Sequence, residues 1–204
     1  MPKRPDPELE VRIVAAAMRL LDRDGEAAIT MRSVAAEAGT TTPTIYERFR
    51  DRDALMRGVI QEATRELLVL LGPLASIESI FDAYLRFNAA RPMRFNLTVE
   101  TFGTRLVAGD KMPVFDLVRS RVRQELGGSP GESEDLSLAV ASLLFGTVRG
   151  MIAAGVDTRH AKVLRRASLA ALRKLVAAFS DEKSANKTSI RCKRTTRRHS
   201  SGQS

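Results

Sequence analysis

The residues between 41 and 52 combine hydroxyl, proline and guanidinium side chains in an order that suits contact with a polyanion. Thr44, Tyr46 and Arg48 are the polar positions of a short predicted helix whose Ile45 and Phe49 face inward. The free N–H groups at the start of a helix, next to hydroxyls and a guanidinium, can hold a phosphate. The pattern therefore predicts a phosphate-binding helix.

The start of this helix is marked by Thr42 and Pro43. Proline at the first turn has a preset φ and loses no useful amide, and the residue before it avoids the α region. Thr42 is therefore the predicted N-cap. An earlier helix is predicted over 31–38, with Thr30 as its cap and Gly39 at its end.

Two short helices with a glycine turn between them form the unit that reads the DNA major groove. Ala35 is small enough for a close approach of the second helix, Gly39 allows positive φ, and Ile45 fills the angle between the helices. The same unit could be a structural helical hairpin, and the spacing favours the DNA-binding interpretation.

Helical periodicity dominates the rest of the chain, and no stretch shows sustained period-two alternation, so we predict an all-α protein. A fourth helix should open at 52 or 53 and end at Gly72-Pro73, with an inner face that includes Leu70. Further helices are predicted over 77–89, 95–104, 114–126, 132–154 and 158–179.

The net charge of +9 belongs mainly to the end of the chain. Residues 183–204 hold seven of the 33 Lys and Arg and none of the 24 acids, which leaves a net charge of +2 on the rest, and residues 1–57 are neutral. We expect residues 181–204 to form a disordered basic tail. The tail either attracts nucleic acid without sequence preference or is a functionally neutral terminus, and we favour the second.

Composition and motifs argue against several other classes of protein. The single Cys rules out a disulfide scaffold and a cysteine-rich metal site, and the two His leave little material for imidazole catalysis. No dinucleotide, Walker, HExxH or CxxC motif is present. We predict no catalytic residues, no metal and no cofactor. No apolar stretch reaches the roughly 20 uncharged residues of a membrane span, and the N-terminus does not read as an export signal, so we expect a cytoplasmic protein.

The first 57 residues resemble the tetracycline-repressor (TetR) family of bacterial one-component regulators. The matching positions are Ile13, Ala16, Ala17, Leu20, Gly25, Thr30, Val34-Ala35, Ala38-Gly39, Thr44-Ile45-Tyr46, Phe49 and Leu55. The chain departs from the family pattern at Thr40, where an apolar residue is usual, and Glu47 on the recognition helix would repel phosphate. Beyond residue 57 the resemblance lies only in the number and length of helices.

The resemblance implies three domains and a set of DNA contacts. Residues 1–57 would be a helix-turn-helix DNA-binding domain, 58–180 a helical effector-binding and dimerisation domain, and 181–204 the basic tail. Pro43 and Thr42 would face base edges, Thr44 and Tyr46 would bind phosphate, and Arg48 would reach phosphate or a base. The full implied set is Thr30, Arg32, Thr41, Thr42, Pro43, Thr44, Tyr46, Arg48 and Arg52.

Large apolar side chains gather in the second predicted domain and could line a ligand pocket between helices. The candidate pocket residues are Phe81, Tyr84, Asn88, Phe95, Phe102 and Phe115. Aromatic residues at helical spacing are more often plain core, so both interpretations stay open.

The two long final helices carry near-heptad stripes that predict a four-helix bundle across a two-fold axis. The candidate interface residues are Leu136, Val140, Leu143, Thr147, Gly150, Leu164, Leu172 and Leu175. An intrachain core is the alternative.

These inferences lead to one hypothesis and two alternatives. We hypothesise a homodimeric repressor that binds a palindromic DNA operator and is released by a small molecule of unknown identity. A non-specific architectural DNA binder aided by the tail, or a helical small-molecule-binding enzyme, would be the alternatives.

Overall fold

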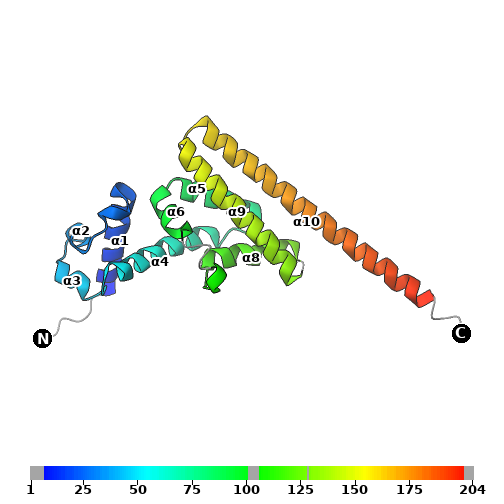
Figure 1. Cartoon of the computed structure of the whole chain (residues 1–204), viewed down its shortest axis with the longest axis horizontal. Helices are drawn as coiled ribbons and strands as arrows, with labels where there is room; N and C mark the ends of the chain where they lie inside the picture. Colours follow the sequence, from blue (N-terminus) through cyan, green and yellow to red (C-terminus); the bar gives the residue numbers. More distant parts are fainter. Residues whose placement is uncertain (1–6, 101–105, 128, 200–204) are drawn as a thin grey trace. The chain divides into compact units, whose positions relative to one another are not determined.

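A computed structural model of the chain describes the backbone of residues 7–100, 106–127 and 129–199, and the side chains of 8–100, 106–127 and 129–181. Every regular element in these ranges is a helix, and Figure 1 shows their order along the chain. The predicted all-α class is confirmed. The helices form two compact units, one of residues 1–74 and 83–116 and one of 75–82 and 117–204.

The first unit begins with α1 (Pro7–Asp24), which ends at Gly25 with φ of 82°. After the short 3₁₀ turn η1 (Glu26–Ala28), α2 (Met31–Glu37) and α3 (Thr42–Tyr46) follow, and α4 (Arg52–Leu71) lies beside α1. α6 (Pro92–Val99) packs on both α1 and α4. The compact unit therefore extends beyond residue 57, where the sequence places the domain boundary.

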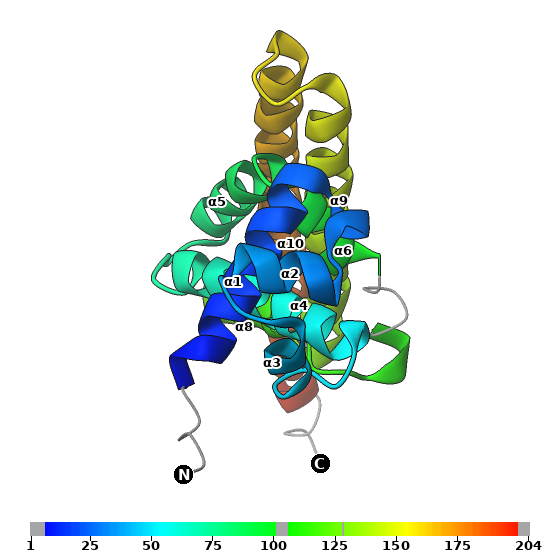
Figure 2. The same ribbon diagram turned by 90° about the vertical axis from the view of Figure 1, so that its left-hand side faces the viewer.

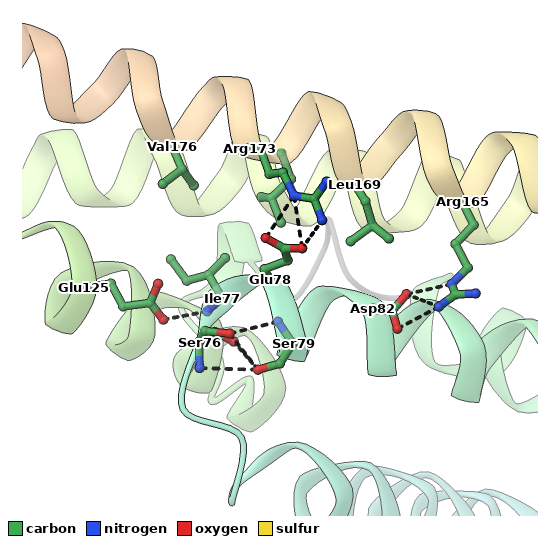
Figure 3. Close-up of a pocket in the computed structure, with 11 residues that line it drawn as sticks. Ser76, Ile77, Glu78, Ser79, Asp82, Glu125, Arg165, Leu169, Arg173 and Val176 are labelled. Carbon is green, nitrogen blue, oxygen red and sulfur yellow. Dashed lines mark hydrogen bonds and ion pairs between the residues drawn. The ribbon is translucent and has the colours of Figure 1, made fainter.

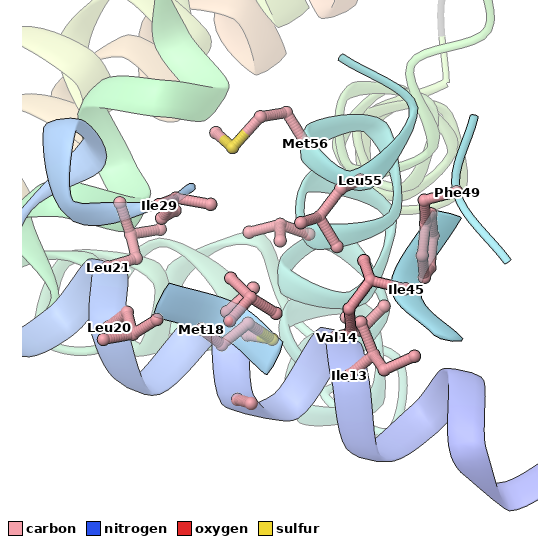
Figure 4. Close-up of a cluster of buried hydrophobic side chains, with 14 of the residues drawn as sticks. Ile13, Val14, Met18, Leu20, Leu21, Ile29, Ile45, Phe49, Leu55 and Met56 are labelled. Carbon is pink, nitrogen blue, oxygen red and sulfur yellow. The ribbon is translucent and has the colours of Figure 1, made fainter. Parts of the chain in front are cut away.

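The N-terminal helices share one apolar core, shown in Figure 4. Ile13, Val34, Ile45 and Leu55, one from each of the four helices α1 to α4, are fully buried. Burial of each such side chain contributes roughly 1.5–3 kcal/mol, which holds the short α3 in place although five residues do not make a stable helix alone. This core fixes the direction in which α3 presents its outer face.

The second unit contains α9 (Pro130–Ala154) and α10 (Arg159–His199), which run antiparallel and side by side. Figures 1 and 2 both show the pair, which is joined by a tight turn at Gly155. α5 (Ile77–Ala89) and α8 (Pro113–Leu126) each begin in one compact unit and end in the other.

A disordered tail is predicted from residue 181, whereas in the structure α10 continues as a helix to His199. No glycine or proline interrupts 159–199, and its many Lys, Arg and Ala residues are good helix formers, so nothing local ends the helix.

α9 is long and apolar enough, by length and composition alone, to cross a membrane. It is also the core helix of the second unit, because nine of its residues are buried there. A buried core helix passes the same test, and these contacts favour that explanation for α9.

Several helix boundaries differ from those predicted. Thr41 rather than Thr42 caps α3, and α9 starts at Pro130, two residues earlier than expected. On α4, Leu71 is buried whereas Leu70 is 41% exposed. The inner face of the helix therefore keeps a spacing of four residues to its end and includes Leu71 in place of the predicted Leu70. The helix after Pro92 begins at that proline and ends at Val99, while residues 101–105 lie outside the described residues.

Candidate nucleic-acid interface

The turn between α2 and α3 is built from a capping box and a glycine. The Thr30 Oγ1 accepts from the Ser33 N–H at 3.0 Å, and the Ser33 Oγ accepts from the Thr30 N–H at 2.9 Å. This reciprocal pair starts α2 at Met31. At the other end, Gly39 has φ of 66°, which lets the chain reverse direction before α3.

The start of α3 is held by hydroxyl groups. The Thr41 Oγ1 accepts from the Thr44 N–H at 3.4 Å and shares a hydrogen bond of 2.9 Å with the Thr44 Oγ1. Pro43 is exposed within the first turn, and Thr42 is half-buried. The hydroxyl groups of Thr41 and Thr44 thus bond to each other and to the first free N–H of the helix. They can bind a phosphate only through their remaining hydrogen-bonding capacity.

The outer face of α3 presents the tyrosine that the sequence singles out. Tyr46 is 54% exposed, whereas its neighbour Ile45 is fully buried. The ring is therefore free to contact another molecule and is not part of the core. Arg32 on α2 is exposed as well.

Unlike the exposed Tyr46 and Arg32, Arg48 and Arg52 have guanidinium nitrogens that are buried or bonded within the protein. The Arg48 Nε is buried without a hydrogen-bond partner. The Arg52 guanidinium donates from Nε to the Ile29 carbonyl at 2.9 Å and from Nη2 to the carbonyl and carboxylate of Glu26, both at 3.1 Å. Arg52 thereby joins the start of α4 to the segment before α2, so its guanidinium is already occupied inside the protein.

Arg50 is a candidate contact that the predicted set leaves out. Its side chain is 93% exposed between α3 and α4, and its only described partner is Asp51 at 3.5 Å. A basic residue between two predicted helices is a weak sequence signal, which explains why pattern alone did not select it.

Glu37 ties α2, the first helix of the helix-turn-helix, to α1. Its carboxylate accepts from the Arg19 Nε at 2.8 Å and from the Arg23 Nη1 at 3.4 Å, which joins α2 to α1. The hydrogen bond from Arg19 is the main reason that the pKa of Glu37 lies below its ordinary value. This exposed network positions α2 and leaves its outer face open.

The aromatic residues predicted for a ligand pocket are core side chains in the structure. Phe81, Tyr84, Phe95 and Phe115 are at most 6% exposed, and Asn88 donates from Nδ2 to the Tyr84 carbonyl at 3.0 Å. Burial raises the pKa of Tyr84 above its ordinary value. Phe102 lies outside the described residues.

A cleft of about 560 Å³ lies elsewhere, within the second unit. It opens between the start of α5, the end of α8 and one face of α10, and Figure 3 shows its lining. Its charged residues come from three helices far apart in the sequence, so no local pattern singles them out and sequence reasoning missed them.

The residues predicted for the dimer interface divide into two groups. Leu136, Val140, Thr147 and Leu172 are at most 7% exposed within the subunit, and the Thr147 and Ser168 hydroxyls lie 2.7 Å apart between α9 and α10. These four form intrachain core, as the alternative interpretation states. The residues that remain accessible are Leu143, Gly150, Leu164 and Leu175.

Comparison with known proteins identifies the N-terminal unit. Residues 13–59 match the family model described as bacterial regulatory proteins, tetR family. This match covers α1 to the first part of α4, the segment whose core and turn are described above. No curated protein matches the sequence closely.

Solved structures share the fold over most of the chain. The transcriptional regulator SCO7222, a TetR from Streptomyces coelicolor, has a TM-score of 0.68 at 18% identity, covering 84% of this chain and 97% of that one. BioQ of Mycobacterium smegmatis has a TM-score of 0.60 at 20% identity, covering 84% and 97%. The multidrug binding protein EbrR, solved with imidazole, has a TM-score of 0.60 at 20% identity, covering 86% and 93%.

At these identities the structures show the fold, and the match over residues 13–59 supplies the sequence evidence. The capped α2, the glycine turn and the exposed face of α3 are the parts that a major-groove reader requires. Residues 13–59 match the tetR family of bacterial regulatory proteins and the chain shares its fold with TetR-family structures, which together support a DNA-binding transcriptional regulator.

Proposed function

We propose that the protein acts in the cytoplasm as a homodimeric repressor that binds a palindromic operator and leaves it when a small molecule binds. The observation that carries the DNA-binding part is the opposite placement of two neighbours on α3, with Ile45 buried and Tyr46 exposed. This placement supports a helix that is held rigidly from behind while its outer face enters the major groove. A structure of BioQ was solved with its double-stranded DNA operator, and it shares this fold at a TM-score of 0.58.

The contacts of α3 with DNA would divide by chemistry. Pro43 and Thr42 would lie against base edges, whereas the hydroxyl of Tyr46 and the exposed guanidinium of Arg50 would bind phosphate. Thr30, Arg32, Thr41, Thr44 and Arg48 would complete the backbone contacts. Arg52 would act by positioning α4, because its guanidinium bonds to Glu26 and Ile29.

A second copy of the chain would cover the outer face of α9. From residue 136 onward this helix is apolar on its buried side and carries mostly small residues on its exposed side, which would let a second helix approach closely. Leu164 of α10 lies against α9, since its Cδ1 would be 3.2 Å from a Cβ added to Gly150 of α9. Between residues 136 and 154 the exposed α9 residues are Ala139, Ser142, Gly146, Arg149 and Ala153, and Leu164 and Leu175 of α10 are more than a third exposed.

Arg94 on α6 offers a route by which ligand binding could reach the DNA-binding helices. It donates from Nε and Nη2 to both carboxylate oxygens of Asp22 on α1 and from Nη1 to Glu66 on α4, with distances of 2.5–2.7 Å. A shift of α6 would therefore pull on both helices that support α3. In this proposal the ligand favours one of two arrangements of these helices, and release from DNA is a population shift.

The test of this function combines oligomeric state with a footprint. Gly146→Glu adds a charge on the proposed dimer face, and a Cβ there meets no atom within 4 Å, so the subunit itself should tolerate it. We expect a dimer and a dyad-symmetric footprint with half-sites about 34 Å apart for the wild type. We expect a monomer with weakened operator binding for Gly146→Glu.

The matched control is Gln61→Glu, which makes the same charge change at an exposed position of α4. It should leave both the dimer and the footprint unchanged. A footprint without dyad symmetry, or equal affinity for operator and random duplex, would contradict the proposal and favour an architectural DNA binder.

A further inference from the structure

The last helix, α10, extends well beyond the helix on which it packs. α10 has 41 residues and its antiparallel neighbour α9 has 25, and both start from the same turn. At a rise of 1.5 Å per residue, α10 therefore continues for about 24 Å past the start of α9. Figure 1 shows this extension in orange to red. The backbone fixes the helical position of each residue in it, and the sequence fixes the charge.

One face of α10 changes its character along the helix. Up to residue 179, buried and half-buried residues recur every three or four positions, as Ala161, Arg165, Ser168, Leu172, Val176 and Phe179. The same spacing continues past residue 181 as Lys183, Lys187, Arg191, Arg194 and Arg198. Positions three and four apart lie on one face of a helix. The face that is covered in the first part of α10 therefore continues as a row of basic positions.

All seven Lys and Arg of the extension share this side of the helix. Lys193 and Arg197 lie at its border, and at about 100° per residue the seven positions fall within an arc of about 160°. The opposite side carries small and hydroxyl residues, among them Ala185, Ser189 and Thr196. Glu182 is the last acid of the chain. A disordered segment would present no such side, whereas the helix turns a run of charges into a basic stripe.

The basic stripe places like charges close to one another. Lys183 and Lys187, Lys187 and Arg191, and Arg194 and Arg198 are each four positions apart, where like charges on a helix repel. The repulsion falls when negative charges lie along the same face. One small anion would reach only part of a stripe that spans about four helical turns. The stripe therefore suits an extended polyanion.

The composition of residues 182–199 favours one kind of polyanion. The segment has no Phe, Tyr or Trp on which the bases of a single strand could stack. Ile190 is its single large apolar residue, whereas helices that lie in a membrane surface carry an apolar face. A second copy of the same stripe would add like charge. Duplex DNA, with one negative charge per roughly 1.7 Å of its axis, requires neither aromatic nor apolar residues.

We propose that the basic stripe of α10 is a second DNA-binding surface, which lies along the phosphates of duplex DNA and does not read its sequence. It goes beyond the proposed function, because it requires neither the dimer nor the ligand. The stripe supplies the long-range attraction that residues 1–57, with no net charge, do not supply. It holds the protein on non-specific DNA, along which α3 can search for its site.

A variant with a neutral stripe tests whether these positions bind DNA. It is the full-length protein with Lys187→Gln, Arg191→Gln, Arg194→Gln and Arg198→Gln. Fluorescence anisotropy with a random-sequence duplex, at several salt concentrations, measures the affinity. We expect an affinity at least about tenfold lower at low salt, and a log–log salt dependence shallower by roughly 0.9 per lost phosphate contact. An unchanged salt dependence would overturn the proposal.

The matched variant keeps the net charge and the composition of the chain. It exchanges each of the same four residues with the next one along the chain: Lys187→Thr with Thr188→Lys, Arg191→Cys with Cys192→Arg, Arg194→Thr with Thr195→Arg, and Arg198→His with His199→Arg. Each exchange moves a charge by about 100° around the helix, so about half of the bases leave the stripe. We expect an affinity between those of the wild type and the neutral variant. Wild-type affinity would show that the segment acts as a polycation without a preferred face, and would overturn the stripe.

Two further probes separate duplex DNA from other polyanions. Single-stranded DNA of the same length should bind more weakly than the duplex, and vesicles with phosphatidylserine should not compete with the duplex for the wild type. Equal or tighter binding of the single strand, lost in the neutral variant, would overturn the assignment to duplex DNA. Vesicle binding that depends on the stripe, together with unchanged duplex binding, would replace DNA by a membrane surface.

The dyad footprint distinguishes failure of this inference from failure of the proposed function. The footprint depends on α3 and on the dimer, so it should persist in the neutral variant at protein concentrations raised to offset the lost attraction. A dyad footprint with a salt dependence that the neutral variant does not change would overturn the stripe and leave the proposed function in place. A stripe-dependent affinity without any dyad would support the stripe and contradict the proposed function.

Discussion

Single side chains with similar chemistry have different tasks near α3. Arg50 and Arg52 are two residues apart, yet the first is 93% exposed and the second donates hydrogen bonds to Ile29 and Glu26. Sequence similarity suggests a phosphate contact for Arg52, and the structure shows a guanidinium engaged in holding the start of α4. A charged residue that bonds backbone carbonyls contributes to stability, whereas an exposed one without such bonds is available for a ligand.

This difference predicts opposite results for two identical substitutions. Arg52→Met should lower the free energy of unfolding by about 1–2 kcal/mol, because the Ile29 and Glu26 carbonyls lose a charged donor. Arg50→Met should leave stability within about 0.5 kcal/mol and weaken binding to all DNA sequences alike. Urea unfolding and fluorescence anisotropy measure the two effects. An equal loss of stability in both variants would contradict the assigned roles.

At the scale of the elements, the turn after α2 depends on backbone conformation, and α6 depends on charge. Gly39 has φ of 66°, and a Cβ there would meet no atom within 4 Å, so only the backbone conformation disfavours a side chain. Arg94 is only 13% exposed and binds carboxylates on two helices. Each element thus depends in part on one residue, and replacing that residue should have a measurable cost in stability.

The next prediction compares alanine substitutions at two glycines, both with room for a Cβ, of which only Gly39 has a positive φ. Gly39→Ala should cost roughly 1–2 kcal/mol of stability, because an L-residue resists positive φ. Gly131, in the first turn of α9, also has no atom within 4 Å of a Cβ but lacks a positive φ. Gly131→Ala should therefore be neutral or slightly stabilising in thermal unfolding, and a loss equal to that of Gly39→Ala would refute the explanation.

The charge prediction concerns the link from α6 to α1 and α4. Arg94→Met should lower the free energy of unfolding by about 3 kcal/mol, because it leaves Asp22 and Glu66 without their partner in a half-buried site. Arg65→Met removes an exposed pair with Glu62 on one helix and should cost less than about 0.5 kcal/mol. Chemical denaturation of both variants checks this. If the two losses are alike, Arg94 is an ordinary surface ion pair.

At the scale of the whole molecule, charge is distributed unevenly along the chain. Residues 1–57 carry ten bases and ten acids, whereas 183–204 carry seven bases and no acid. The DNA-binding unit therefore has no net positive charge of its own, and its affinity depends on where individual arginines point. The basic end of α10 carries most of the net positive charge of the chain and would be the main source of long-range attraction to DNA.

A chain ending at Asp181 tests that source. If the removed segment neutralises phosphates, the dependence of operator affinity on salt concentration should become shallower by roughly one unit of log–log slope per lost contact. Thermal unfolding should not change, because the core described for residues 8–181 stays in the shortened chain. An unchanged salt dependence would mean that the segment does not contact DNA.

The amino-acid sequence alone determined the all-α class, the helix-turn-helix and the tetR-family resemblance of residues 13–59, because these depend on local signals. The caps at Thr30, the glycine turn at 39 and the apolar stripe of α1 act within a few residues, so their pattern is visible in one dimension. The boundaries of most helices follow for the same reason.

Only the tertiary structure decided which apolar stripe faces inward and which charges pair. Leu136 and Leu172 belong to near-heptad stripes, but packing of α9 on α10 buries them within one subunit. The Arg165–Asp82 pair joins residues 83 positions apart, and no local pattern distinguishes it from two solvated charges. Long-range packing sets these contacts, because burial depends on which helices meet and periodicity alone does not specify the partner.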